Sequence, residues 1–205
     1  MEKKQKIGAI YKIGGFLAFL MLGYLGLRGY KNSVEQLKIN GCIKDISILS
    51  YNIQETFRNQ HDYGKLDYNQ VVSLRAIPER MRHEGFGEAL NSYLGGVDIF
   101  YSSFEKDRPY SAFEISFQGL SSQGCMALVK MNWDVNSGGN LIAIAGYPTA
   151  TPAGVLDEIY PSTASKDIKE SNVFKGADAP YVSNDRVERA CACKKNICSV
   201  VWKFH

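Results

Sequence analysis

An uncharged apolar run, Ile13 to Leu27, stands near the start of the chain and is hydrophobic around the full circumference of a helix. Such a run needs lipid or a deep interface. Its 15 residues span only about 22 Å as a helix, short of a hydrocarbon core of roughly 30 Å. A start at Ile7, with Lys12 reaching toward the lipid headgroups, supplies the missing length. We therefore predict that residues 13–29 form the transmembrane half of a long helix.

After this run the apolar residues continue on one face only. They recur at intervals of mostly three or four residues, at Val34, Leu37, Cys42, Ile46, Leu49, Ile53 and Phe57. This spacing is typical of an amphipathic α-helix. Because no proline precedes Pro78, the helix can continue from the membrane run to about Phe57. We predict one rod that is apolar all round in its first half and one-faced in its second.

Shorter elements follow the predicted rod, which gives an α+β class. Gly96 to Ser102 and Ala112 to Phe117 alternate between apolar and polar positions, and Asp107-Arg108-Pro109 lies between them, so they predict an antiparallel hairpin. Further predicted elements are short helices at Asn69 to Leu74 and from Ser121 or Ser122 to about Trp133, and strands at Leu141 to Ala145 and Ser199 to Phe204. Residues 147–190 contain four prolines and no sustained period. We expect a surface region with short elements there.

The net charge of +3 is confined to the start of the chain. Residues 1–12 carry Lys3, Lys4, Lys6 and Lys12 against Glu2, which leaves 20 basic and 20 acidic residues in the remainder. A neutral remainder has no basic face for phosphates, so nucleic acid is not an expected partner. By the positive-inside rule, residues 1–12 form a basic cytoplasmic leader. Residues 30–205 are then an exported domain, which predicts a single-pass inner-membrane protein with a periplasmic C-terminal part.

Two other kinds of targeting signal would remove the apolar run. An ordinary signal peptide requires small residues at its cleavage site, whereas Tyr24, Leu25, Leu27 and Arg28 end this run. A lipoprotein signal would end in a cysteine, and Cys42 lies more than ten residues beyond the run. We therefore expect a retained anchor.

Cysteine usage agrees with export. The five cysteines are Cys42, Cys125, Cys191, Cys193 and Cys198. Cysteines in an oxidising compartment usually pair. Three of them crowd the C-terminus, so we expect at least one bridge from the tail to a distant cysteine. The odd count leaves one thiol over.

The sequence contains no recognisable catalytic motif. His61, His83 and His205 stand in polar contexts, and a C-x-C-x4-C-x6-H spacing that ends at His205 is not a common structural zinc pattern. Ser121-Ser122 lacks the flanking residues of a nucleophile elbow. We expect no enzyme activity, no cofactor and no metal.

Several segments resemble, in order, the landmarks of type IV pilins of the IVb class. They are Cys42 to Phe57, Tyr63 to Leu66, Ile77 to Met81, Asn91-Ser92 with Gly95 to Val97, Phe113 to Cys125, and Cys193 to Phe204, which is similar to the closing Cys-rich loop and last strand of that family. The resemblance covers roughly residues 13–133 and 190–205. It implies a pilin-like fold in which the long helix packs on an antiparallel sheet.

The resemblance also implies a function. The protein would be a structural subunit, a pilin or minor pilin, of a type IVb-like pilus or a related secretion pseudopilus, with a possible part in cell adhesion. Its partners would be other pilins through the N-terminal helix, the inner membrane and the pilus assembly machinery. Gly23 and Gly26 would let neighbouring helices approach closely. A disulfide from Cys125 to Cys191 or Cys193 would stabilise the domain by about 3–5 kcal/mol, and a buried free thiol is the alternative for Cys125.

Processing is the point at which the sequence departs from the family pattern. In type IV pilins a peptidase cuts after a glycine before the apolar run, and Gly15-Phe16 matches that junction. The family then has a glutamate five residues into the mature chain, where this sequence has Leu20. A minor pilin, a pseudopilin or an uncleaved relative tolerates that loss better than a major subunit. The alternative function is a non-polymerising, single-pass periplasmic component of an envelope or secretion machine.

Overall fold

The computed structural model describes the chain except residues 1, 61, 65, 84–87, 134–139, 164–167, 169–171, 176–182 and 195–196, and it describes side chains from Leu20 onward. The backbone forms two compact units, Met1–Leu37 and Lys38–His205. The second unit contains the sheet and the hydrophobic core.

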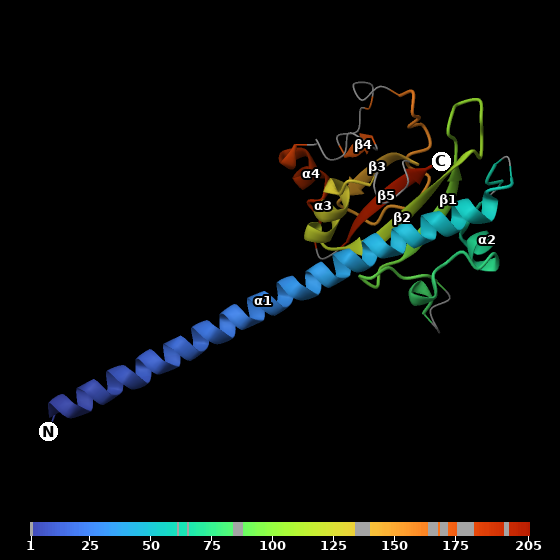
Figure 1. Ribbon diagram of the computed structural model, residues 1–205. Helices are drawn as coiled ribbons and strands as arrows, with labels where there is room; N and C mark the ends of the chain where they lie inside the picture. The colour runs from blue at the N-terminus through green and yellow to red at the C-terminus, as the bar shows by residue number, and fades with distance from the viewer. Residues whose placement is uncertain are drawn as a thin grey trace. The chain divides into compact units, whose positions relative to one another are not determined.

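A long helix, α1, runs from Glu2 to Phe57 (Figure 1). The prediction of a long N-terminal helix is confirmed. In the second unit, the residues Cys42, Ile46, Leu49 and Ile53 are 0% exposed, at the three- and four-residue intervals of the sequence pattern. The predicted stripe begins later than expected, because Leu37 is 71% exposed and Ile39 is the first buried position.

Five antiparallel strands form one sheet in the order β1-β2-β5-β3-β4 (Figure 1). Their bounds are Val97–Ser102 for β1, Ala112–Leu120 for β2, Leu141–Tyr147 for β3, Val173–Lys175 for β4 and Cys198–Phe204 for β5. The predicted hairpin is confirmed as β1 and β2, with Val97 opposite Phe117 and Ser102 opposite Ala112. The C-terminal strand lies in the middle of the sheet rather than at an edge.

The first face of the sheet carries the main core. Phe113, Ile115 and Phe117 of β2 alternate onto this face, as the sequence pattern predicts, and join one cluster with the buried stripe of α1. Helices α3 (Ser122–Lys130) and α4 (Asn184–Ala190) contribute to the same cluster. The Ser121 hydroxyl caps α3 by accepting a hydrogen bond from Gly124 N at 2.9 Å.

Two short helices complete the second unit. Helix α2 (Tyr68–Ser73) is capped by Asp67, whose carboxylate accepts a hydrogen bond from Gln70 N at 2.8 Å. A 3₁₀ turn, η1 (Glu79–Met81), follows Pro78 and buries Met81. The predicted helix at Asn69 to Leu74 therefore corresponds to α2, shifted by one residue.

The opposite face of the sheet is covered by a segment that we call the strap, Thr149 to Tyr160. Glu114, Ser116 and Lys203 point to this face and are 0% exposed. The expectation that residues 147–190 form a surface region is therefore wrong in part. Leu156 and Val187 are 0% exposed, and Val173 and Phe174 are 2% exposed. The region lacks a periodic pattern because loop backbone and isolated apolar side chains, rather than long regular elements, provide its contacts.

Candidate functional site

The first functional feature is the apolar surface of α1. The described residues that follow the first turns are exposed: Leu20 51%, Met21 72%, Leu22 69%, Tyr24 63%, Leu25 61%, Leu27 64% and Tyr30 69%. Apolar side chains at consecutive positions point in all directions around a helix, so they cannot all be buried by one neighbour. A surface of this kind requires lipid or several partner helices.

Small residues interrupt this apolar surface at regular spacing. A Cβ atom placed on Gly23, Gly26 or Gly29 would meet nothing within 4 Å. These three glycines stand at intervals of three residues along the helix. Open backbone at such positions allows another helix to approach closely.

The predicted membrane and processing segments fall partly outside the described residues. Gly15 and Phe16 lie within the bounds of α1, but their side chains are not described. Among the side chains that are described, from Leu20 on, no helix is long and apolar enough to cross a membrane. The predicted span, residues 13–29, begins before that point, so the span and the Gly15-Phe16 junction stay predictions.

A polar clamp joins α1 to the loop that precedes β1. Asp45 lies on the buried side of α1, and its Oδ1 is 2.6 Å from Nη2 of Arg80. Its Oδ2 accepts a hydrogen bond from the Ser92 hydroxyl at 2.8 Å, and Arg80 also donates to the Gly41 carbonyl at 3.0 Å. Gly41 is required there, because a Cβ at this position would overlap the Ser92 side chain. The clamp fixes the helix to the domain at a point next to the first buried residues of α1.

Burial sets the protonation of the groups at this clamp. It raises the pKa of Asp45, while Ser92 and Arg80 oppose that rise. Burial, followed by the neighbouring Asp45, raises the pKa of the Cys42 thiol to about 12. Cys42 is therefore a protonated buried thiol, the one free cysteine of the five.

Two disulfides hold the C-terminal part of the chain. Cys125 of α3 is bonded to Cys191, directly after α4, across 66 residues of sequence. Cys193 is bonded to Cys198 at the start of β5. The sequence left the pairing open between Cys191 and Cys193, and the fold selects Cys191. The first bond therefore ties the segment after α4 to α3, and the second closes the short loop before β5.

A further feature is the placement of the described side chains that could hold a metal ion. Within the described part of the chain, no three His, Cys, Asp or Glu side chains come together as a metal site requires. His83 and His205 line two different surface hollows, and His61 lies outside the described residues. The three C-terminal cysteines are all engaged in disulfides.

The strap encloses a polar cluster that the sequence did not reveal. The Glu114 carboxylate accepts hydrogen bonds from Gly154 N at 2.7 Å and Leu156 N at 3.0 Å. Lys203 donates from Nζ to the carbonyls of Leu156 at 3.0 Å and Asp157 at 2.8 Å. Strand alternation places Glu114 opposite the core face, and only the tertiary structure shows that this position is covered.

A long N-terminal helix with an exposed apolar first part, packed through its second part on an antiparallel sheet with a disulfide-bonded tail, defines the type IV pilin class. The PilS N-terminal family model matches residues 37–174, about two thirds of the chain. The chain belongs to this family of type IVb pilins. Membership of this family points to a structural protein.

One solved structure agrees with this assignment at the level of the fold. TcpA, a type IV pilin from Vibrio cholerae El Tor biotype, superposes with a TM-score of 0.55 over 82% of this chain and 99% of that chain, at 15% identity. The type IVb pilin from Salmonella typhi gives a TM-score of 0.49 over 78% of this chain and 95% of that chain, at 11% identity. No curated protein sequence matches the chain.

Proposed function

We propose that the protein is a pilin or minor pilin that assembles through α1 into a type IVb-like pilus or a related secretion pseudopilus. The observation that carries this proposal is the exposure of consecutive apolar residues from Leu20 to Tyr30. Helices withdrawn from a bilayer and packed side by side would bury this surface, and Gly23 and Gly26 would let their backbones approach. The partners would be other pilins, the inner membrane and the assembly machinery.

The proposed topology follows from charge and cysteine chemistry. Residues 1–12 would remain in the cytoplasm, residues 13–29 would cross the inner membrane before assembly, and residues 30–205 would lie outside. The two disulfides support this orientation, because such bonds persist in oxidising compartments. After assembly the domain would be extracellular, where it could also take part in adhesion.

Leu20 favours a minor subunit over a major one. Pilins of this class have a glutamate at the corresponding position, and its carboxylate can pair with the charged amine at the new N-terminus of a neighbouring subunit. Leu20 cannot do so, because it carries no charge. A subunit present in few copies requires this contact less often than one that repeats along the filament.

The same residue supports a second candidate function. A chain that keeps its leader has no free amine at Phe16, so it has no need of the glutamate. The protein would then be a fixed, non-polymerising periplasmic component of an envelope or secretion machine. The exposed apolar part of α1 would face lipid permanently.

The native N-terminus separates these two candidates. Intact mass and N-terminal sequencing of the protein from its own cells would show a chain that starts at a methylated Phe16 if it is a processed pilin. A Gly15→Val variant should then accumulate at full length and disappear from filaments sheared off the cells, while Gly29→Val, a matched glycine change farther along α1, should still be processed. An intact Met1 in the wild-type protein would reject the processed-pilin function and support the fixed component.

A further inference from the structure

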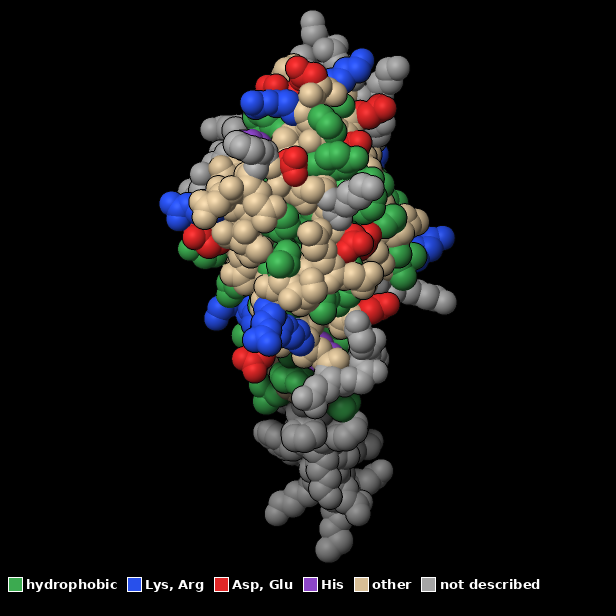
Figure 2. Space-filling view, turned by 90° about the vertical axis from the view of Figure 1, so that its right-hand side faces the viewer, with side chains coloured by type: hydrophobic (Ala, Val, Ile, Leu, Met, Phe, Trp, Pro, Cys, Tyr) green, Lys and Arg blue, Asp and Glu red, His purple; other side chains and the backbone are tan. Residues whose placement is uncertain are grey.

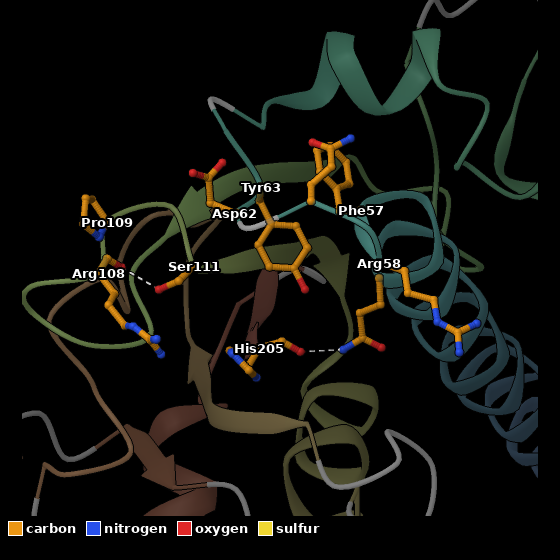
Figure 3. Close-up of a pocket in the computed structure, with 10 residues that line it drawn as sticks. Phe57, Arg58, Asp62, Tyr63, Arg108, Pro109, Ser111 and His205 are labelled. Carbon is orange, nitrogen blue, oxygen red and sulfur yellow. Dashed lines mark hydrogen bonds between the residues drawn. The ribbon is translucent and has the colours of Figure 1, made fainter.

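A pocket lies between the end of α1 and His205, the residue that follows β5. It has a volume of about 480 Å³ and is lined by the last turns of α1, by Gln60, Asp62 and Tyr63, by the loop before β2 and by His205 (Figure 3). This volume lies within the usual range of small-molecule pockets. None of its lining residues belongs to the apolar surface at Leu20 to Tyr30, so the assembly surface does not account for it.

An aromatic ring forms one wall of this pocket. Tyr63 packs edge-on against Phe113, with ring centroids 4.8 Å apart, and lies tilted against Phe57, with centroids 5.4 Å apart. Its backbone N donates to the Tyr110 carbonyl at 2.7 Å. The ring is therefore held in place by the core rather than by its hydroxyl. That hydroxyl has no hydrogen-bond partner among the described residues, and burial raises the pKa of Tyr63 to about 12, so it remains a donor.

Arg108 and His205 add polar groups to the pocket that the Tyr63 ring lines. The loop that carries Arg108 is fixed, because Arg108 N donates to the Glu105 carbonyl at 3.0 Å and Phe104 N donates to the Ser111 hydroxyl at 2.9 Å. Figure 3 shows the Arg108 guanidinium directed toward His205. No ion pair or hydrogen bond engages this guanidinium among the described residues. It is therefore available to a ligand.

His205 is positioned by its backbone carbonyl and by ring stacking, and no described residue forms a hydrogen bond with its ring nitrogens. Its carbonyl accepts a hydrogen bond from Gln54 at 2.8 Å, and its ring lies 4.1 Å from the ring of Phe104. Burial and the neighbouring Arg108 lower the pKa of His205, opposed by Glu105. The imidazole is thus mostly neutral at pH 7 and offers one donor and one acceptor.

The charge balance argues against a polyanionic ligand. Arg58 points away from the pocket (Figure 3) and pairs with Glu55 at 3.2 Å. The carboxylate of Asp62 lies on the rim, which offsets the charge of Arg108. On the face that Figure 2 shows, acidic and basic side chains are likewise interspersed. A phosphate-rich ligand would find only one unpaired guanidinium here.

We propose that this pocket binds a neutral saccharide ring, a hexose or an N-acetylhexosamine. Sugar hydroxyls both donate and accept hydrogen bonds, which matches the Tyr63 hydroxyl, the Arg108 guanidinium and the His205 imidazole. The Gln54 and Gln60 amides on the rim can serve further hydroxyls. The apolar C–H face of a sugar can lie on the fixed Tyr63 ring. The pocket belongs to a single subunit, so this binding does not depend on filament assembly.

The test is saturation-transfer difference NMR on the full-length protein, purified in a detergent without a sugar headgroup. The probes are glucose, galactose, N-acetylglucosamine, N-acetylgalactosamine and, as an anionic comparison, N-acetylneuraminic acid. Arg108→Gln should weaken binding at least about ten-fold, as expected for a lost hydrogen bond to a charged group. Tyr63→Phe keeps the ring packing and should weaken binding about three- to ten-fold. Lys106→Gln removes the same charge from the same loop outside the pocket and should leave binding unchanged.

Three results would overturn the saccharide assignment. They are the absence of saturation transfer to every neutral sugar, equal binding by the wild type and both pocket variants, and binding of N-acetylneuraminic acid alone with loss at high salt. The last result would identify an anion site instead. Because a monomer suffices for binding, failure here would leave the proposed assembly function untouched.

Discussion

Glu114 and Lys203 lie directly opposite each other in the register of β2 and β5, and both are 0% exposed. They do not form a close ion pair; each instead bonds to the backbone of the strap. Glu114 accepts from the N–H groups of Gly154 and Leu156, whereas Lys203 donates to the carbonyls of Leu156 and Asp157. The carboxylate and the ammonium therefore provide hydrogen-bond partners for N–H and carbonyl groups of the strap, which is not a strand of the sheet.

Replacing both members of this pair should cost less than the sum of the two single replacements. Glu114→Gln leaves the Lys203 ammonium buried without its neighbouring carboxylate and should lower the free energy of unfolding by about 3 kcal/mol. Lys203→Met leaves the carboxylate buried in the same way. The double variant should be less destabilised than the sum of the two by at least about 1 kcal/mol. Denaturant unfolding of all four proteins measures this, and strict additivity would show that the charges do not interact.

Lys203 should also make stability depend on pH. Burial lowers its pKa to about 8 from 10.5, opposed by Glu114 and Asp157. Between these values the unfolded chain binds the proton and the folded chain does not, so stability contributed by this residue rises with pH. We expect a rise on the order of 2 kcal/mol from pH 8 to pH 10. The measurement is the difference in unfolding free energy between the wild type and Lys203→Met; a constant difference over this range would contradict it.

Arg80→Gln should destabilise the domain by about 3 kcal/mol at neutral pH, because it leaves the carboxylate of Asp45 buried and unpaired. Burial already raises the pKa of Asp45, and loss of Arg80 should raise it further. A folded pKa above the unfolded value makes stability fall as pH rises, so the defect should shrink when the carboxyl is protonated at acidic pH.

Unfolding experiments at pH 5 and pH 7 test this prediction, with Asp45→Asn combined with Arg80→Gln as the control. The double variant has no carboxyl at this position and should show the same loss at both values. A defect of Arg80→Gln that is equal at both pH values would mean that Arg80 acts through its packing alone.

The two disulfides should contribute unequally. The bond between Cys125 and Cys191 closes a loop of 66 residues, and its removal by paired alanine substitutions should cost about 4 kcal/mol. The bond between Cys193 and Cys198 closes a loop of 5 residues, and its removal should cost about 2 kcal/mol. Thermal unfolding under non-reducing conditions compares them. A larger loss for the short loop would indicate that native contacts, rather than chain entropy, dominate.

The amino-acid sequence determined the elements whose signal is local. The stripe from Cys42 to Phe57 predicts α1, because helical periodicity depends only on neighbouring turns. The alternation at Phe113, Ile115 and Phe117 predicts β2 and its core face for the same reason. The pilin resemblance came from the order of such segments along the chain, which is itself a property of the sequence.

The tertiary structure decided what depends on residues distant in the chain. The choice of Cys191 over Cys193 as the partner of Cys125 follows from where α4 ends beside α3. The burial of Glu114 follows from the strap, whose nonperiodic sequence gives no sign that it covers a sheet. The pocket at Tyr63 and Arg108 likewise needs His205, about 100 residues further on. Periodicity reports which face of an element is apolar, but it cannot report which segment covers the other face.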